Sequence, residues 1–239
     1  MKIGVLLTQW KRHHLEKQLV QIYNQTIRPD YIIVFQNGNH VDITELKKKY
    51  NFIHVKSDYN TKYFGRFAYF FSIPVDICIV MDDDIIPGIN CIKNYTDQCV
   101  KKNGIIGGNG RLGLLTNISN TNSLYNTIIP DVGPREGLLV DFVGHMWVFK
   151  KDWLYYMFSI KPFTYDTGED MHLCFSSKLL GGIKSYIGEQ KTREDMSDLS
   201  MNALAGDLVA SWRTVTDNDR KKVEQYWIGK GLKFIEKLN

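Results

Sequence analysis

Short apolar runs alternate with amphipathic segments over the first 83 residues, and this alternation constrains the fold more than any other feature of the sequence. The apolar runs read as strands at 2–10, 31–38, 52–57 and 76–83, and the segments between them read as helices at 14–25, 42–50 and 62–72. In the first of these helices Leu15, Leu19 and Ile22 share one face. Strands separated by short helices form βαβ units, so the pattern predicts an α/β fold with a mostly parallel sheet.

The second half of the chain is less regular. It begins with a glycine-rich strand or turn at 104–113 and a long polar loop at 114–137 that contains Pro130 and Pro134. A strand that leads into a helix follows at 138–154, and the next helix starts at Gly168 or Glu169 and ends at Gly181–Gly182. A strand at 183–188 and a terminal helix at 216–231 complete the chain's predicted elements. We expect a single domain over residues 1–239, made of two halves at about 1–105 and about 106–239.

Composition excludes several classes of protein. A chain of 239 residues that is 44% hydrophobic is large enough to bury a substantial core. The net charge of +4 is small and scattered, which argues against nucleic acid as a partner and suits small anionic molecules. The four cysteines have no C-x-x-C spacing, so we expect reduced thiols in the core.

No stretch of the sequence resembles a targeting or membrane-spanning segment. The apolar run near the N-terminus is only about five residues long, shorter than a signal peptide requires. No apolar run approaches the roughly 20 residues that cross a bilayer. We therefore expect a cytoplasmic protein.

Three consecutive aspartates, Asp82 to Asp84, follow the fourth predicted strand directly. In a parallel sheet the strands end at one edge, where ligands bind, so the aspartates should lie beside Thr8, Trp10, Gln36 and Asn37. Burying unpaired carboxylates is unfavourable, so a positively charged group should lie near them. Alternate residues of an extended segment share a side, so Asp82 and Asp84 should face the ligand while Asp83 turns away.

Two other interpretations of the aspartates remain at this stage. An exposed acidic turn is the simpler one, although an apolar strand leading directly into three aspartates disfavours it. A haloacid-dehalogenase-type phosphatase would need Thr or Val at the position of Ile86.

Taken in order, the motifs resemble those of GT-A fold nucleotide-sugar glycosyltransferases. Residues 5–38, with Gln-Thr-x-x-Pro at Gln25 to Pro29, resemble the first βαβ unit of glycosyltransferase family 2; "VMDDD" resembles the DxD motif, and "TGEDM" resembles the acidic motif of inverting members. The triple aspartate and the size resemble small glycosyltransferases of large DNA viruses such as chloroviruses, and the Asn-, Lys- and Ile-rich composition suits a viral or low-GC bacterial source. The resemblance ends near Ile187.

The resemblance implies a donor site. Asp84 would bind Mn²⁺ or Mg²⁺, Asp82 would assist through the metal or the ribose, and Asp83 belongs to the same donor-binding motif. Arg66 would contact the base or diphosphate, with Lys62 a weaker candidate; the alternative for Arg66 is a surface arginine lying over aromatic side chains.

The nucleotide end of the donor site departs from the family pattern. The resemblance assigns uracil contacts to Thr8 and Trp10. Many relatives have an aspartate at the end of the second strand, where this chain has Gln36 and Asn37. An amide both donates and accepts hydrogen bonds, so a UDP-sugar remains the expected donor, with GDP and dTDP left open.

On the acceptor side, the resemblance makes Asp170 the base and Glu169 the group that orients the acceptor. Capping of the helix is the alternative for both residues. His145 is a candidate acceptor contact or extra metal ligand, and Trp147 a candidate stacking platform, although a structural role fits either residue. His172 reads as structural, and Arg193 and Arg213 are weak candidates for closing over the diphosphate.

The sequence therefore predicts a metal-dependent glycosyltransferase that moves a sugar from a nucleotide donor, expected to be UDP-linked, to a glycan or glycoprotein acceptor with inversion. Retention of configuration within the same fold is one alternative. A nucleotidyltransferase is disfavoured because no glycine follows the first strand at 8–14. A carbohydrate-binding protein with a degenerate transferase fold is the non-enzymatic alternative.

Overall fold

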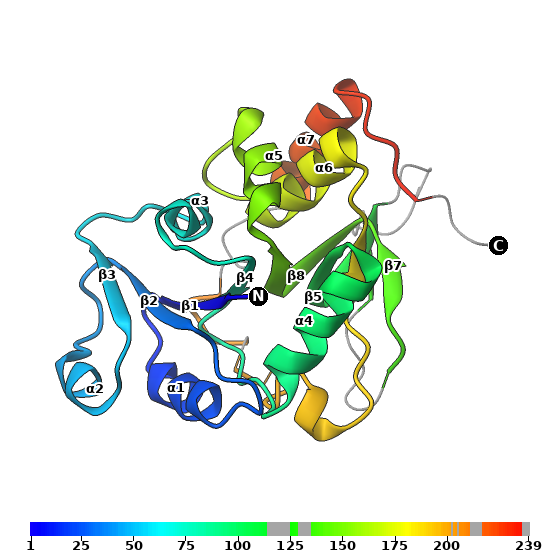
Figure 1. Cartoon of the computed structure of the whole chain (residues 1–239). Coiled ribbons are helices and arrows are strands. Elements are labelled where there is room, and N and C mark those ends of the chain that lie inside the picture. The colour runs from blue at the N-terminus through cyan, green and yellow to red at the C-terminus, as the bar shows by residue number, and fades with distance from the viewer. Residues whose placement is uncertain (114–124, 129–134, 202, 205, 211–216, 236–239) are drawn as a thin grey trace.

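The strands form one continuous mixed sheet in the computed structural model, which describes residues 1–113, 125–128, 135–201, 203–204, 206–210 and 217–235. Within these residues nine strands pair in the order β3-β2-β1-β4-β8-β5-β9-β7, and β6 adds to β5 (Figure 1).

The first half of the sheet is parallel, as the alternation predicted. It consists of β1 (Ile3–Gln9), β2 (Tyr31–Asn37), β3 (Ile53–Ser57) and β4 (Ile77–Met81), and β1 lies between β2 and β4. All four strands therefore end at the same edge of the sheet. β1 and β4 are buried along most of their length because helices cover both faces, which explains their continuous apolar sequence.

The helices of this half cover opposite faces of the sheet. They are α1 (Leu15–Tyr23), α2 (Thr44–Lys49) and α3 (Phe64–Ala68), the last continued by a 3₁₀ turn at Tyr69–Ser72. In Figure 1, α1 and α2 lie below the strands and α3 lies above them. Leu15, Leu19 and Ile22 are buried, which confirms the predicted apolar face of α1.

An antiparallel strand inserts into the middle of the sheet in the second half of the chain. After α4 (Cys91–Lys102) come β5 (Ile105–Gly113), β6 (Tyr125–Ile128), β7 (Leu138–Val140) and β8 (Phe142–Lys150), and β9 (Ser185–Ile187) follows later. β8 pairs antiparallel with both β4 and β5.

Two expectations for this half were wrong. The segment 114–137 is not one long loop, because Tyr125–Ile128 pairs with β5; its residues 114–124 and 129–134 lie outside the described part. The strand expected from residue 138 onward is two strands. β7 pairs with β9 and β8 with β4 and β5, so the chain changes neighbours at buried Asp141.

Three further helices pack over this half: α5 (Leu154–Ser159), α6 (Glu169–Gly181) and α7 (Asp217–Gly229). The predicted bounds of α6 are confirmed. Gly168 before it and Gly182 after it have φ values of 80° and 65°, which glycine adopts without steric strain. Figure 1 shows α5, α6 and α7 together on the face of the sheet that α3 also covers.

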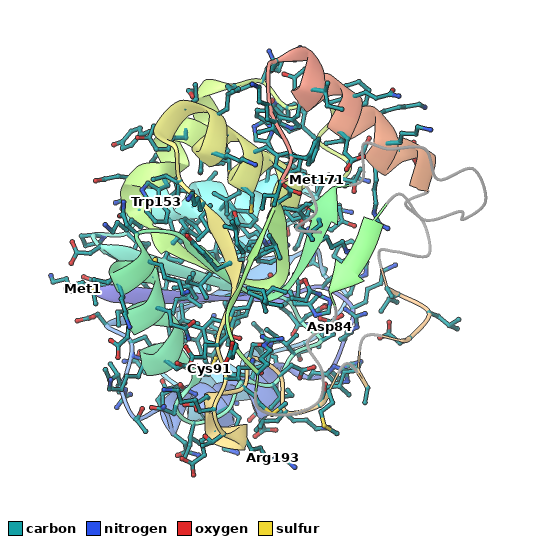
Figure 2. All side chains as sticks on the ribbon, turned by 90° about the vertical axis from the view of Figure 1, so that its right-hand side faces the viewer. Met1, Asp84, Cys91, Trp153, Met171 and Arg193 are labelled. Carbon is teal, nitrogen blue, oxygen red and sulfur yellow. The ribbon has the colours of Figure 1, made fainter. Side chains whose placement is uncertain are left out.

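Side chains fill the space on both sides of the sheet (Figure 2). Cys78, Cys91, Cys99 and Cys174 are buried with free thiols, as expected. Within the described residues, no helix is both long and apolar enough to cross a membrane.

After β9 the chain returns to the segment that carries the aspartates, residues 82–88, which we call the aspartate turn. Gly88 N–H donates to Met196 O (2.8 Å) and Leu199 N–H donates to Ile86 O (2.6 Å). The Ile86 N–H donates to the Asp198 carboxylate (3.0 Å). The tail after Gly188, which resembled no known family, therefore holds the aspartate turn in place.

Candidate active site

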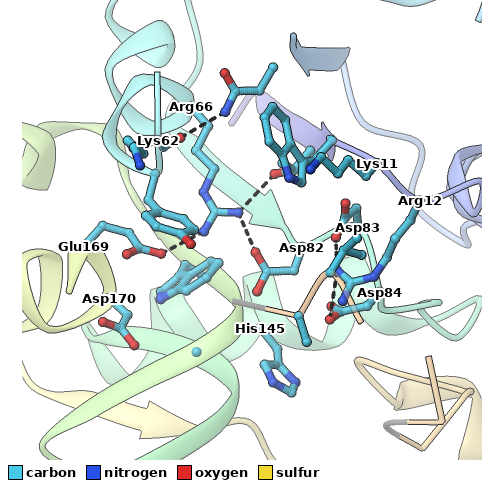
Figure 3. A pocket seen from close by; sticks show the side chains of 18 of the residues that line it. Lys11, Arg12, Lys62, Arg66, Asp82, Asp83, Asp84, His145, Glu169 and Asp170 are labelled. Carbon is cyan, nitrogen blue, oxygen red and sulfur yellow. Dashed lines mark hydrogen bonds and ion pairs between the residues drawn. The ribbon is translucent and has the colours of Figure 1, made fainter. Parts of the chain in front are cut away.

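A pocket of about 450 Å³ lies at the edge where the parallel strands end. The predicted residues Thr8, Trp10 and Asn37 line it, and so do Arg66, the three aspartates, His145, Trp147, Glu169 and Asp170. Figure 3 shows Arg66 between Glu169 and Asp82, with Arg12 beside Asp83 and Asp84. Residues from both halves of the sheet thus meet in one cavity.

The three aspartates do not alternate as expected. Asp82 follows β4, but the chain turns at Asp83 and Asp84, so the period of an extended segment is lost. The expectation that Asp83 turns away from the pocket was therefore wrong: all three aspartates line it. Asp83 accepts a hydrogen bond from Arg12 Nη1, which also lies 3.3 Å from Asp84 Oδ2.

Arg66 is buried at the centre of the site, with 4% of its surface exposed, so the alternative of a surface arginine is excluded. Its Nη1 donates to Thr8 Oγ1 (3.0 Å) and to Asp82, and its Nη2 donates to Glu169 Oε1 (3.0 Å). The guanidinium also lies 4.8 Å from the centre of the Trp147 ring. Arg66 thereby joins the end of β1, the aspartate turn and the start of α6.

Arg12 is the main site residue that the sequence interpretation missed. Its Nε and Nη2 donate to the two carboxylate oxygens of Asp207 (2.7 and 2.8 Å), and its Nη1 donates to Asp83. The strand-end rule that selected Thr8 and Trp10 would also have selected Arg12, three residues after β1. No local signal points to Asp207, which is 195 residues away.

Carboxylates and positively charged side chains are both concentrated in the site: Lys11, Lys62, Arg111 and Arg220 line the pocket together with Arg12 and Arg66. Within the described part of the chain, five carboxylates share two guanidinium groups through ion pairs: those of Asp82, Asp83, Asp84, Glu169 and Asp207. Burial, with the nearby Asp82 charge, raises the pKa of Asp84 to about 7. Burial and the Asp170 charge raise the pKa of Glu169 to about 8. The nearby guanidinium groups therefore do not offset the cost of burying these two carboxylates in their charged form.

Glu169 and Asp170 enter the pocket from the first turn of α6. The residue that caps the helix is Gly168, so both carboxylates lie in the first turn, where the helix N-terminus stabilises their charged forms. Asp170 Oδ1 accepts from the Met171 N–H (2.7 Å), and burial raises the pKa of Asp170 above its ordinary value. A raised pKa makes a carboxylate a stronger base near neutral pH.

At the nucleotide end, Asn37 and Gln36 separate. Asn37 lines the pocket, and its amide is fixed by Asn60 (2.9 Å) and the Thr61 N–H (2.8 Å). Gln36 is buried outside the pocket lining, where it donates to Val41 O (2.6 Å) and lies 2.8 Å from His54 Nε2. The structure thus brings Asn37, but not Gln36, to the cavity.

His145 occupies an unusual backbone position in the pocket wall. Its φ is 64°, and the pairing of β5 with β8 shifts register next to it, between Gly107 and Asn109. Its carbonyl accepts from the Asp82 N–H (3.0 Å). Burial lowers the pKa of His145, so its ring is neutral at physiological pH.

The remaining predicted residues have clear positions. Trp147 lines the pocket, yet only 2% of its surface is exposed and its Nε1 donates to Val143 O (2.8 Å). His172 Nε2 lies 2.8 Å from Met157 O, away from the pocket lining, which agrees with a structural role. Lys62 lines the pocket, Arg193 is exposed outside it, and Arg213 lies outside the described residues.

The site fits a divalent cation only if a ligand shares the coordination. Within the described residues, no group of three or more His, Cys, Asp or Glu side chains is arranged to hold a metal ion. Asp84 Oδ1, however, is buried without a hydrogen-bond partner. Mg²⁺ and Mn²⁺ bind well to one or two carboxylates together with the oxygens of a substrate phosphate. The aspartate turn offers the carboxylates of such a site.

No protein-family model matches the chain, and no curated protein matches its sequence. Among solved structures, it matches the mannosyltransferase PcManGT from Pyrobaculum calidifontis, in complex with GDP-Man and Mn²⁺, at a TM-score of 0.61 and 13% identity over 96% of this chain. It also matches S. aureus TarS at a TM-score of 0.55 and 12% identity over 80% of this chain. The match to the structure of TarS 1-349 has a TM-score of 0.55 and 14% identity, also over 80% of this chain. The chain has a glycosyltransferase fold.

This glycosyltransferase fold spans only part of those proteins: the chain covers 64% of PcManGT, 36% of TarS and 59% of TarS 1-349. The fold class predicted from the sequence, a mixed sheet flanked by helices with the GT-A arrangement, is confirmed.

Proposed function

We propose that the protein is a nucleotide-sugar glycosyltransferase that depends on a divalent cation. The observation that carries this proposal is the cluster of three adjacent aspartates at the strand-end edge of a glycosyltransferase fold, with Asp84 Oδ1 buried and unpartnered. A sugar nucleotide brings a diphosphate, and a shared cation balances its charge together with that of the aspartates.

Asp84 and Asp82 are the residues that would hold Mn²⁺ or Mg²⁺. The cation supplies positive charge where the diphosphate develops negative charge as it leaves. Arg66 fixes the Asp82 carboxylate through Nη1 and, through the same guanidinium, sets the position of Glu169. The donor and acceptor sides of the pocket are thereby held in a constant relation, which transfer in a single displacement needs.

Asp170 is the proposed base. It removes the proton from the acceptor hydroxyl as that oxygen attacks the anomeric carbon, so the product has inverted configuration. Burial and its raised pKa suit a group that must hold a proton near neutral pH. Glu169 orients the acceptor, and a glycan or glycoprotein is the acceptor we expect.

UDP is the nucleotide we expect, and GDP is the second one to test because a structural neighbour was solved in complex with GDP-Man and Mn²⁺. Thr8, Trp10 and Asn37 line the pocket from the ends of β1 and β2, where the base and ribose would lie. Gln36 is not carried into this proposal, since it lies outside the pocket lining.

The test is calorimetric titration of UDP and of GDP into the protein, first with Mn²⁺ and then with excess EDTA. We expect micromolar binding of one nucleotide that is lost with EDTA. Sugars linked to that nucleotide are then assayed for release of the nucleoside diphosphate, and Asp170→Asn should abolish transfer while binding the donor normally. If neither UDP nor GDP binds in the presence of Mn²⁺, the proposal is contradicted.

A further inference from the structure

Arg12 connects the aspartate turn to a segment near the other end of the chain. Its Nε and Nη2 form a fork with the two oxygens of Asp207, at 2.7 and 2.8 Å. Its Nη1 donates to Asp83 and lies 3.3 Å from Asp84 Oδ2. The side chain is only 9% exposed and lines the pocket, so this connection is made inside the site.

The two edges of the guanidinium face different partners. An arginine has five N–H donors, and the fork with Asp207 occupies two of them. Nη1, on the other edge, is directed at Asp83 and at Asp84, and of these two Asp84 is the residue expected to bind the cation. Without a cation, Arg12 supplies part of the positive charge that Asp83 and Asp84 require.

A divalent cation at Asp84 changes this balance. A cation held by Asp84 would share the negative charge that Arg12 now balances, and Arg12 would repel it unless an anion lay between them. The diphosphate of a donor is such an anion, and the planar guanidinium pairs with phosphate oxygens through two parallel hydrogen bonds. The fork with Asp207 is undisturbed by this exchange, so it holds the arginine in the pocket throughout.

We propose that Arg12 binds the diphosphate of the donor and that Asp207 is the residue that positions it. This inference rests on the proposed function, because it concerns the same donor. Asp207 acts through Arg12: its fork restrains a long side chain that would otherwise lose rotamer entropy on binding phosphate. The neighbouring Leu208, Val209 and Ala210 line the same pocket, so the ion pair also fixes that wall.

The test compares three ligands that differ only in phosphate number. Calorimetry with Mn²⁺ first identifies which of UDP and GDP the unmodified protein binds more tightly. It then measures the affinity for that diphosphate and for the nucleoside monophosphate and the nucleoside with the same base. Arg12→Ala should weaken diphosphate binding about 10- to 100-fold and leave nucleoside binding within about twofold. Arg12→Lys keeps the charge but lacks the fork, so its affinity for the diphosphate should lie between those of the unmodified protein and Arg12→Ala.

Asp207→Asn keeps the shape of the side chain and removes its charge. It should weaken diphosphate binding about 3- to 10-fold, again with little effect on the nucleoside. In the Arg12→Ala background the same change should have no further effect, because a positioning residue has nothing left to position. Arg28→Ala and Asp97→Asn are matched controls, since both residues are exposed and outside the pocket lining.

Equal losses of nucleoside and diphosphate binding in Arg12→Ala would overturn the inference, since they would make Arg12 a structural residue only. Full additivity of Asp207→Asn with Arg12→Ala would overturn the role of Asp207. The unmodified protein decides the proposed function separately: if it binds neither nucleotide, that function fails before any variant is compared.

Discussion

Arg66 Nη2 and Glu169 Oε1 are 3.0 Å apart, although the two residues are 103 positions apart in the sequence. Arg66 lies on α3, in the parallel half, and Glu169 begins α6, in the half that carries the proposed base. This ion pair therefore holds the two halves of the site together, and four predictions follow from the arrangement around it.

Arg66→Met should destabilise the protein by about 3–5 kcal/mol, because it leaves the Asp82 carboxylate without its positive partner and the buried Glu169 carboxyl group without its hydrogen-bond donor. Urea denaturation at pH 7 measures the free energy of unfolding. The matched control is Arg28→Met, an exposed arginine over the Tyr23 ring, which should change it by less than about 1 kcal/mol. A loss below 1 kcal/mol in Arg66→Met would show that the carboxylates do not need this partner.

Glu169→Gln should change how stability depends on pH. The folded-state pKa of Glu169 is about 8, above the ordinary value of 4.5, so the folded protein binds this proton more tightly than the unfolded chain. The resulting stability is fully present below pH 4.5 and is lost as the pH rises toward 8. Between pH 5 and 7.5 the unfolding free energy of the native protein should fall relative to that of Glu169→Gln. The slope of this fall should approach about 1.4 kcal/mol per pH unit.

Urea denaturation of both proteins at several pH values, without metal, measures this difference. A difference that stays constant with pH would mean that Glu169 is ionised throughout the range.

Asp84→Asn should separate stability from binding. The carboxylate of Asp84 is buried and its pKa is raised to about 7, so at pH 8 its charge is unfavourable in the metal-free protein. We expect the variant to unfold at an equal or higher temperature than the native protein without metal, and to lose about 100-fold or more of its Mn²⁺-dependent nucleotide affinity. A lower melting temperature with normal nucleotide binding would assign Asp84 a purely structural role.

Gly88→Ala should disturb the aspartate turn from outside the pocket. A Cβ at this position would lie 2.4 Å from Glu194 O and 2.8 Å from Arg193 O, and both are backbone atoms that cannot move independently. We expect a loss of about 1–3 kcal/mol in unfolding free energy and weaker nucleotide binding. Gly229→Ala is the matched control, because nothing lies within 4 Å of the added carbon. Unchanged stability of Gly88→Ala would mean that the tail adjusts freely.

The sequence predicted the parallel half of the fold well because the information there is local. Each strand and helix from Ile3 to Met81 has its own periodicity, and the parallel connections leave little choice of order. The strand-end rule then placed Thr8, Asn37 and the aspartates at one edge without any knowledge of contacts. The start of α6 at Glu169 agrees with the start predicted at Gly168 or Glu169.

The rest depended on contacts that periodicity does not encode. The apolar pattern of Phe142–Lys150 identifies a strand but not its antiparallel insertion between β4 and β5. Asp83 was misassigned because the alternation rule needs extended backbone, and the chain turns at this residue. Arg12 and Asp207 meet only in the folded molecule, and Gln36 looked like Asn37 until the amide of each was seen with its partners.

The return of the tail to the aspartate turn also sets the order in which a newly made chain completes this site. The Ile86 N–H donates to the Asp198 carboxylate, 112 residues further on. Ribosomes add about 5–20 residues per second, so Asp82 to Asp84 wait roughly 6 to 22 seconds for that partner, and longer for Asp207. During this interval the growing chain holds three adjacent acidic groups without the segment that later encloses them. The surroundings of the aspartate turn are therefore completed only late in translation, after most of the sheet has already been made.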